Sequence, residues 1–474
     1  MQNILTSLLL PHFRSIAGLS VSQLLYGFLQ AAQNQKPIQY NGELIDLDSK
    51  IVHEIEHYSR MAVASYGRKV TMKSNLSTFN PESFLPTDDS PFYTNDITSM
   101  LEIQLGDDAY LEFLLDHCGL QVEDLLYYCF EGASLNTSNG TEFHSPPVFI
   151  LRDTMSRSIV VLVRGTHDFN DILIDIYGKE MKWEEGFVHE VLIHISHHSQ
   201  GIGMIAKSIA TDPQILSILE EALTQHTDYT LKVVGHSLGA SIAALTAIYW
   251  HTHHTFRSFE NRGENELFLR CFAFAPPPAI SKEVKEKGVG FVYSVVNEDD
   301  IVPRLNTIRQ YVDPSIVNSC ADKDSEDREE LRRSFRQISH HSISEEKEVY
   351  PILSKSIFSS SYAPVMPNVG NEIDASIYGS YVLPGSIYLF HPAIADGKKY
   401  LEYEEEKNMY VKSIKSLISL FVARQAPKAP GVMYFSSEQQ FPQVVRLSLY
   451  FTIHHNFAMY ENAIREIVNG NTQK

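Results

Sequence analysis

The chain has 474 residues, of which 43% are hydrophobic and 20% charged, and its formal net charge is −19. These proportions are typical of a folded globular protein with a sizeable buried core. The negative charge argues against a nucleic-acid partner, whose phosphates attract basic surfaces, and against a general attraction to anionic lipids.

The sequence carries no recognisable export or membrane-spanning signal. Its first residues, MQNILTSLLLPHFRSIAGLS, lack a basic start and are interrupted by Pro11, His12 and Arg14, so they make a poor signal peptide. No uninterrupted apolar stretch reaches the roughly 20 residues of a transmembrane helix. Four scattered cysteines fit a reducing compartment better than a disulfide framework. We expect a cytoplasmic protein that can dock peripherally on a membrane or a lipid-droplet surface.

The first hundred residues are expected to form an N-terminal helical extension (1–100), followed by a larger domain over residues 101–474. Residues 1–35 have a helical pattern. In residues 48–66, apolar residues recur at helical spacing after Asp48, a candidate cap, which predicts an amphipathic helix. Residues 70–100 are rich in Ser, Thr, Asn and Pro and predict a long loop.

From about residue 146, short β-branched runs alternate with helical stretches. Helices are expected near 200–224, 239–252 and 456–467, and strands at Val148–Leu151, Ile159–Arg164, Leu231–Val234, Phe268–Phe274, Phe291–Val296, Ile387–Phe390, Val432–Phe435 and Leu447–Ile453. This alternation predicts an α/β fold, a mostly parallel sheet with helices on both faces.

The segment LKVVGHSLGAS, residues 231–241, carries the strongest chemical signal. An apolar strand runs into its G-x-S-x-G motif and a helix follows at once, which is the setting of a nucleophile elbow. The elbow strains the serine backbone and exposes the hydroxyl, while Gly235 and Gly239 leave room for the neighbouring strand and helix. We predict that Ser237 is a nucleophile; the alternative is a tight strand-to-helix turn without chemistry.

A serine nucleophile needs a base that a third group orients. In folds with such an elbow, the acid follows the serine and the base follows the acid. The buried strand 291–296 ends at Asp299 and Asp300, and both are candidates for the acid. We prefer Asp300 because it directly precedes the buried turn of residues 301–303; the alternative is a polar strand exit.

Five histidines follow these aspartates: His340, His341, His391, His454 and His455. We predict that His455 is the base, because it lies between the last strand and the last helix, the usual place of the catalytic imidazole in this fold. His454 and His391 are then structural. His340 and His341 lie in a charged segment where nothing fixes their position.

Two backbone amides must stabilise the oxyanion that forms when the serine attacks. Leu238, directly after the nucleophile, is expected to supply one. Thr166 is expected to supply the other, because the strand 159–164 ends beside it and Gly165 permits a close approach. This chemistry requires no metal and no organic cofactor.

Six phrases of the sequence together resemble the class 3 lipase family, and most closely its sn-1-specific diacylglycerol lipase branch. They are HYSRMAVASYG (57–67), SIVVLVRGTHDFNDILIDI (158–176), VVGHSLGASIAAL (233–245), CFAFAPPPAIS (271–281), FVYSVVNEDDIVPRL (291–305) and IHHNFAMYENAI (453–464). The resemblance implies an α/β-hydrolase fold. It also assigns the nucleophile, acid, base and oxyanion donor to the residues chosen above: Ser237, Asp300, His455 and Thr166.

The resemblance further implies hydrolysis of acylglycerols, in particular of diacylglycerol to monoacylglycerol and fatty acid. A phospholipase or galactolipase on the same fold and a non-catalytic lipase-like scaffold are the alternatives. An insertion is expected at about 311–380, of which residues 320–348 are the most polar part. Residues 320–366 are expected to form a lid or regulatory loop, the alternative being a surface loop without influence on activity.

Overall fold

The computed structural model of the chain describes residues 42–67, 107–165, 179–305, 381–394, 430–441 and 455–469, with short gaps inside all of these ranges except the first. Several predictions lie outside the described residues. They concern residues 1–35 and 70–100, the strand at 447–453, the insertion at 311–380, and the side chains of Thr166, His340, His341 and His454.

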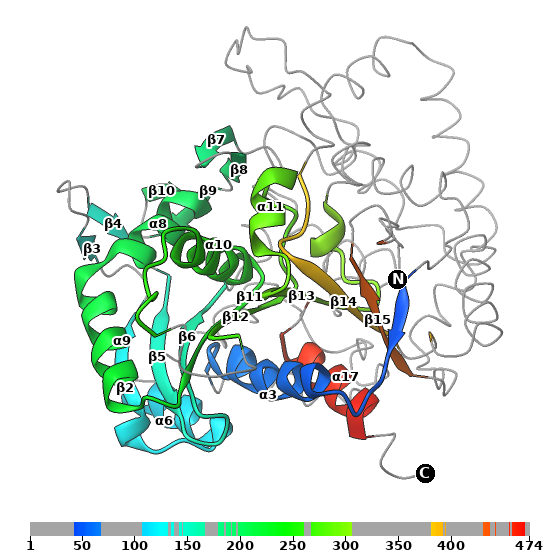
Figure 1. Cartoon of the computed structure of the whole chain (residues 1–474), viewed down its shortest axis with the longest axis horizontal. Helices are drawn as coiled ribbons and strands as arrows, with labels where there is room; N and C mark the ends of the chain where they lie inside the picture. The colour runs from blue at the N-terminus through cyan, green and yellow to red at the C-terminus, as the bar shows by residue number, and fades with distance from the viewer. Residues whose placement is uncertain are drawn as a thin grey trace, which may run out of the picture.

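Nine strands of the described residues form one sheet (Figure 1). In spatial order they are β1 (Glu43–Ile45), β15 (Gly431–Phe435), β14 (Ser386–His391), β13 (Val292–Asn297), β12 (Leu269–Phe274), β11 (Thr230–His236), β6 (Ser158–Val163), β5 (Val148–Asp153) and β2 (Leu125–Cys129). The strands β6, β11, β12, β13 and β14 run parallel, and the outer ones pair antiparallel. The mostly parallel sheet and the strands predicted within the described residues are therefore confirmed.

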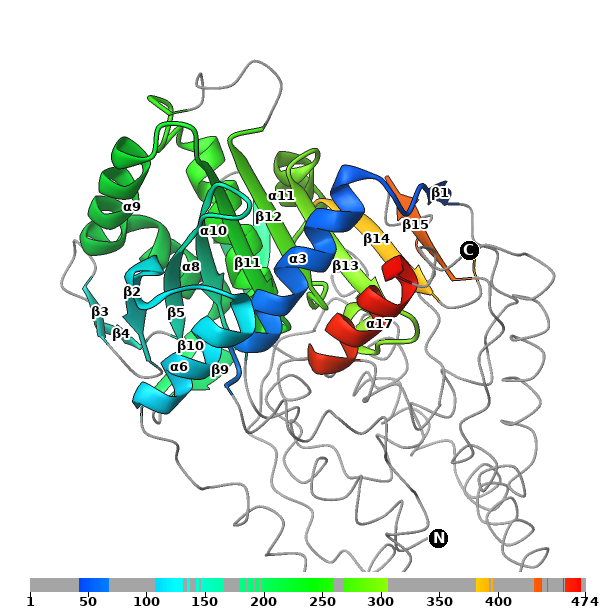
Figure 2. The ribbon, with the colours of Figure 1, turned by 90° about the horizontal axis from the view of Figure 1, so that it is seen from below.

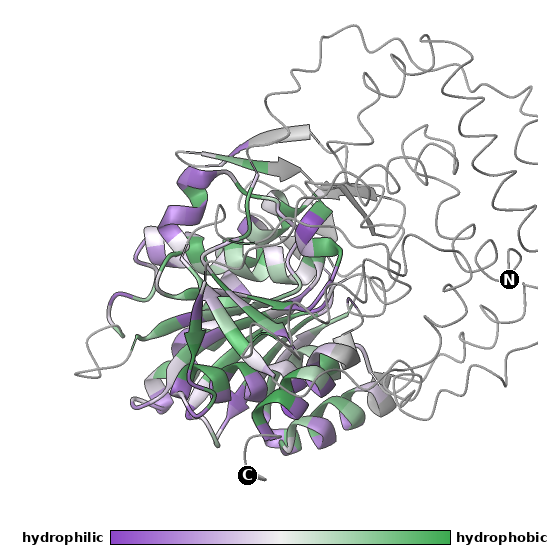
Figure 3. Cartoon of the chain, turned by 90° about the vertical axis from the view of Figure 1, so that its right-hand side faces the viewer, coloured by the Kyte–Doolittle hydropathy of each residue, from purple (hydrophilic) through white to green (hydrophobic). Residues whose placement is uncertain are grey.

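Helices cover both faces of this sheet (Figure 2). On one face lie α8 (Ile202–Thr211), α9 (Pro213–Gln225), α10 (Leu238–Thr252) and α11 (Lys282–Gly288). On the other lie α3 (Lys50–Ala64), α6 (Asp107–Cys118) and α17 (Phe457–Asn469). Along β5, Val148 and Ile150 belong to the core under α8–α11, while Phe149 and Leu151 belong to the core under α3, α6 and α17. Burial on both faces explains why the strands are near-continuous apolar runs, which stand out as hydrophobic in Figure 3.

Shorter elements surround the sheet. Three two-stranded hairpins and two 3-10 turns complete the described structure: β3 (Ser134–Asn136) with β4 (Glu142–His144), β7 (Lys179–Trp183) with β8 (Gly186–Glu190), β9 (Leu192–Ile195) with β10 (His198–Gly201), η3 (Val122–Asp124) and η5 (Val302–Arg304). Among the helices of the described ranges, none is long and apolar enough to cross a membrane.

The helical stretch predicted near 200–224 is confirmed, and it consists of two helices, α8 and α9. The break falls at Asp212, whose carboxylate accepts hydrogen bonds from the amides of Gln214 (2.9 Å) and Ile215 (3.0 Å). An aspartate cap followed by Pro213 in the first turn is a strong helix start, and proline cannot continue the preceding helix. The chain therefore ends α8 and begins α9 at the same residue.

The predicted amphipathic helix at 48–66 is confirmed as α3, although its N-cap is Ser49 and not Asp48. The helix lies across the sheet beside α17, and its apolar face, with Val52, Ile55 and Tyr58, is buried. The preceding strand β1 pairs with β15 at the edge of the sheet. The boundary near residue 100 remains a prediction, but this part of the proposed extension packs as an integral part of the sheet and its helix layer.

A polar network links α3 to the turn between β5 and β6 through hydrogen bonds. His57 Nε2 lies 2.6 Å from Asp153 Oδ2, and Ser156 Oγ donates to the same oxygen. Burial of the Asp153 carboxylate opposes its charge, but the hydrogen bonds from His57 and Ser156 outweigh this effect and lower the pKa of Asp153. The charged carboxylate therefore stabilises the fold.

We expect Asp153→Asn to lower the free energy of unfolding by about 1.5–3 kcal/mol at neutral pH, the usual size for hydrogen bonds to a charged group. Because the pKa of Asp153 is lower in the folded than in the unfolded chain, the stabilisation is complete above the unfolded value of about 3.9 and is lost as the pH falls through the folded value. Urea unfolding at about pH 7 and about pH 3 measures this difference.

The matched control for this prediction is Asp228→Asn. Asp228 Oδ2 lies 3.4 Å from Arg157 Nη1 in an ion pair whose side chains are 59% and 71% exposed. Such surface pairs contribute little, so the control should leave the unfolding free energy unchanged at both pH values. A loss in Asp153→Asn that is equally large in acid would contradict the prediction.

Candidate active site

The Ser237 elbow joins β11 to α10 at the carboxyl edge of the parallel strands. Ser237 has φ 60° and ψ −130°, a backbone conformation that residues other than glycine rarely adopt and that indicates backbone strain. A Cβ atom added to Gly235 would lie 2.3 Å from the carbonyl oxygen of Gly239, and one added to Gly239 would lie 2.4 Å from that of Val163. Both glycines therefore leave room for the neighbouring backbone, as the motif predicts.

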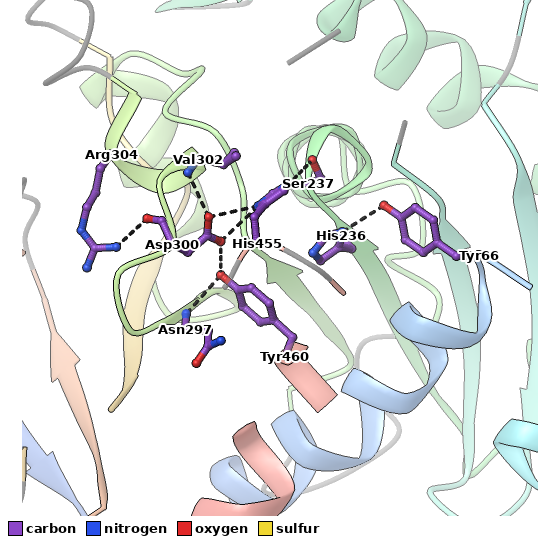
Figure 4. A network of polar contacts seen from close by, with 9 residues as sticks. All are labelled: Tyr66, His236, Ser237, Asn297, Asp300, Val302, Arg304, His455 and Tyr460. Carbon is purple, nitrogen blue, oxygen red and sulfur yellow. Dashed lines mark hydrogen bonds and ion pairs between the residues drawn. The ribbon is translucent and has the colours of Figure 1, made fainter. Parts of the chain in front are cut away.

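Ser237, His455 and Asp300 form one hydrogen-bonded chain (Figure 4). Ser237 Oγ lies 3.0 Å from His455 Nε2, and the opposite ring nitrogen lies 3.1 Å from Asp300 Oδ1 and 3.2 Å from Oδ2. All three residues are buried. The structure thus brings together the three residues that the sequence analysis singled out, from the ends of β11 and β13 and from the segment before α17.

Asp300 is held from several sides. The amide of Val302, at the start of η5, donates to Asp300 Oδ1 over 3.0 Å, and Arg304 Nη1 donates to the Asp300 carbonyl over 2.6 Å. These contacts come from the turn after β13, which is buried as expected from the sequence. The carboxylate is therefore fixed in orientation toward His455.

Tyr460 of α17 is a further contact of Asp300 that the sequence analysis missed. Its hydroxyl donates to Asp300 Oδ2 and accepts the amide hydrogen bond of Asn297 over 3.1 Å. Burial, followed by the negative charge of Asp300, raises the pKa of Tyr460 well above its ordinary value. Tyr460 therefore stays protonated and donates to Oδ2 of the carboxylate, which also lies 3.2 Å from His455 Nδ1.

A second missed contact involves the residue before the nucleophile. His236 is 2% exposed, and its Nδ1 lies 2.9 Å from the hydroxyl of Tyr66, which follows α3. The His236 ring lies beside the His455 ring, with centroids 5.1 Å apart. Burial, and then the neighbouring His455, lower the pKa of His236 well below its usual value, so its imidazole is neutral.

The expected oxyanion donors are only partly within the described residues. Leu238 is the first residue of α10, so its amide lies at a helix N-terminus, where the partial positive charge favours an anion. Thr166 follows directly on Gly165, the last described residue after β6. A Cβ atom added to Gly165 would lie 3.1 Å from Ser237 Cβ. The backbone that leads to Thr166 therefore passes directly beside the nucleophile.

Of the other histidines considered as the base, only His391 is described. It ends β14, is fully buried, and its backbone pairs with Gly431 of β15. It therefore belongs to the same edge of the sheet as the proposed site, while His455 makes the hydrogen bonds to Ser237 and Asp300.

Comparisons with known proteins show what the chain is similar to. Residues 160–310 match the class 3 lipase family, a range that contains Ser237 and Asp300, and this match confirms the resemblance inferred from the motifs. Diacylglycerol lipase-beta of Mus musculus is 31% identical over 194 residues, which cover 41% of this chain and 25% of that protein. Diacylglycerol lipase-alpha of Homo sapiens is 30% identical over 178 residues, covering 36% of this chain and 15% of that protein.

The chain thus spans a quarter or less of the length of these two relatives. Among solved structures, a lipase from Rhizopus microsporus var. chinensis aligns over 61% of this chain and 78% of its own, with 18% sequence identity and a TM-score of 0.35.

Proposed function

We propose that the protein is a serine hydrolase that cleaves the carboxylic esters of acylglycerols, because residues 160–310 match the class 3 lipase family. The observation that supports this most directly is the buried chain of hydrogen bonds from Ser237 through His455 to Asp300. A hydroxyl, an imidazole and a carboxylate in this order are the working parts of nucleophilic acyl transfer.

The proposed reaction runs through an acyl-enzyme. Ser237 Oγ attacks the ester carbonyl carbon while its proton passes to His455 Nε2, and Asp300 stabilises the resulting imidazolium at Nδ1. The amides of Leu238 and Thr166 hold the carbonyl oxygen as it becomes negative, each worth about 3–4 kcal/mol in comparable sites. The intermediate then expels the alcohol, which takes the proton from His455. Water attacks the acyl-serine by the same route and releases the fatty acid.

The proposed substrate is diacylglycerol, which would yield monoacylglycerol and a fatty acid. The similarity to diacylglycerol lipases supports this choice. We also propose that the reaction takes place in the cytoplasm at a lipid surface, because four scattered cysteines fit a reducing compartment.

A lipid panel tests the proposed substrate. We expect faster hydrolysis of diacylglycerol than of phosphatidylserine or phosphatidic acid in matched mixed micelles, because a protein of net charge −19 repels anionic head groups. Fatty-acid release is measured with the wild type and with Ser237→Ala as the blank. Faster turnover of an anionic lipid would favour a phospholipase, and inactivity on every ester would favour a non-catalytic scaffold.

A further inference from the structure

Tyr66 lies between the end of β6 and the elbow that carries Ser237. Its side chain is buried, and its hydroxyl contacts His236 Nδ1 over 2.9 Å. The backbone amide of Gly165, at the exit of β6, donates a hydrogen bond to the same oxygen. A Cβ atom on Gly165 would approach that oxygen to 2.5 Å, so the two groups are in close contact. One hydroxyl thus connects the strand exit before Thr166 with the elbow residue before Ser237.

The direction of these hydrogen bonds follows from the neighbours. The Gly165 amide can only donate, so the Tyr66 oxygen accepts there and its own proton is available for His236 Nδ1. The imidazole of His236 is neutral and then carries its proton on Nε2. The hydrogen bond therefore fixes both the tautomer and the plane of the His236 ring.

The His236 ring in turn packs against His455 and against Tyr460, the residue that donates to Asp300. It lies tilted by 34° beside His455, and it meets the ring of Tyr460 edge to face at a centroid distance of 5.5 Å. Tyr460 donates to Asp300. A displaced His236 ring would therefore disturb both the imidazole and the carboxylate partner. Figure 4 shows Tyr66 beside His236, and His236 beside Ser237 and His455.

We propose that Tyr66 is a positioning residue for acyl transfer, holding the Gly165 backbone and the His236 ring in the arrangement that the oxyanion and the His455 imidazole require. This inference rests on the proposed hydrolase function. Tyr66 acts through Gly165 and His236 and touches neither substrate nor the reacting atoms. Its contribution is a geometric one, since displacements of about 1 Å at such sites cost about a hundredfold in rate.

Tyr66→Phe tests the inference, with Tyr58→Phe as a matched control. Both tyrosines are buried and belong to the same segment, but the Tyr58 hydroxyl lies 3.1 Å from Ser156 Oγ and 3.1 Å from Ser158 Oγ, near the start of β6 and far from the elbow. Activity on a short soluble ester is measured per active site, counted by fluorophosphonate titration, together with the melting temperature.

We expect Tyr66→Phe to lower kcat about tenfold or more while KM changes less than about twofold, because a misplaced oxyanion donor affects the transition state and not ground-state binding. Tyr58→Phe should lower the melting temperature to a similar extent and keep the wild-type kcat per active site. A purely structural role for Tyr66 would give both variants the same behaviour and would overturn the inference.

His236→Phe keeps an aromatic ring but removes Nδ1, so it tests the same link from the other end, also if Tyr66→Phe fails to fold. It should lower kcat, and the double variant should lose less than the product of the two single losses, because the residues share one hydrogen bond. Fully multiplicative losses would overturn the inference. Failure of the proposed function is recognised separately, because the wild type itself would then hydrolyse no ester.

Discussion

Replacing Ser237 by alanine is expected to abolish ester hydrolysis and labelling by a fluorophosphonate probe. Loss of the nucleophile in a comparable triad lowers kcat about a millionfold. Ser237 Oγ lies 3.0 Å from His455 Nε2, so this hydroxyl is in position to lose its proton as it attacks. Labelling of the purified protein followed by peptide mapping, together with an ester assay, measures both losses.

Ser241→Ala is the matched control for Ser237→Ala. Ser241 lies one turn further along α10, is equally buried, and donates from Oγ to the carbonyl of Pro277 over 3.3 Å. We expect this variant to keep the labelling of Ser237 and most of the activity. A probe that still reacts with Ser237→Ala would show that another residue is the nucleophile.

The main features of the fold could be predicted because the pattern of apolar residues within a short segment indicates whether that segment is buried. Strands buried on both faces read as continuous apolar runs, and the elbow is recognised by a strand, a G-x-S-x-G motif and a helix in immediate succession. The choice of Asp300 rested on the buried turn after β13, and that turn does hold the carboxylate through the amide of Val302. In each case the signal lies within a few residues of the feature that it predicts.

Contacts between distant segments could not be predicted in this way. Tyr66 and His236 are separated by 170 residues, and Tyr460 and Asp300 by 160, so no spacing in the sequence relates them. His236 occupies a variable position of the G-x-S-x-G motif, which gives no reason to single it out. The burial of α3 is a similar case, because an amphipathic pattern shows that one face is covered but not which surface covers it.

The break between α8 and α9 was missed although its signal is local. An aspartate followed by a proline is a typical helix start, but the apolar residues continue at helical spacing on both sides of Pro213. In the structure, the cap that Asp212 forms separates the two helices.

His455→Ala should lower kcat by about five to six orders of magnitude, the loss expected when the base of a triad is removed. The reason is that His455 contacts Ser237 Oγ through Nε2 and Asp300 through Nδ1, so it is placed both to accept the serine proton and to be oriented by this carboxylate. The measurement is kcat for a soluble ester, with the melting temperature of each variant as evidence of folding.

His391→Ala is the control that makes this test selective. His391 is also buried, and it ends β14 at the carboxyl edge of the sheet, so its removal costs packing to a comparable degree. We expect it to reduce stability while keeping kcat within about tenfold of the wild type, since deletion of a buried side chain acts mainly on folding. If instead His391→Ala were inactive and His455→Ala active, the proton would be transferred by a histidine from β14. The geometry around Asp300 would then have to change during the reaction for that carboxylate to orient it.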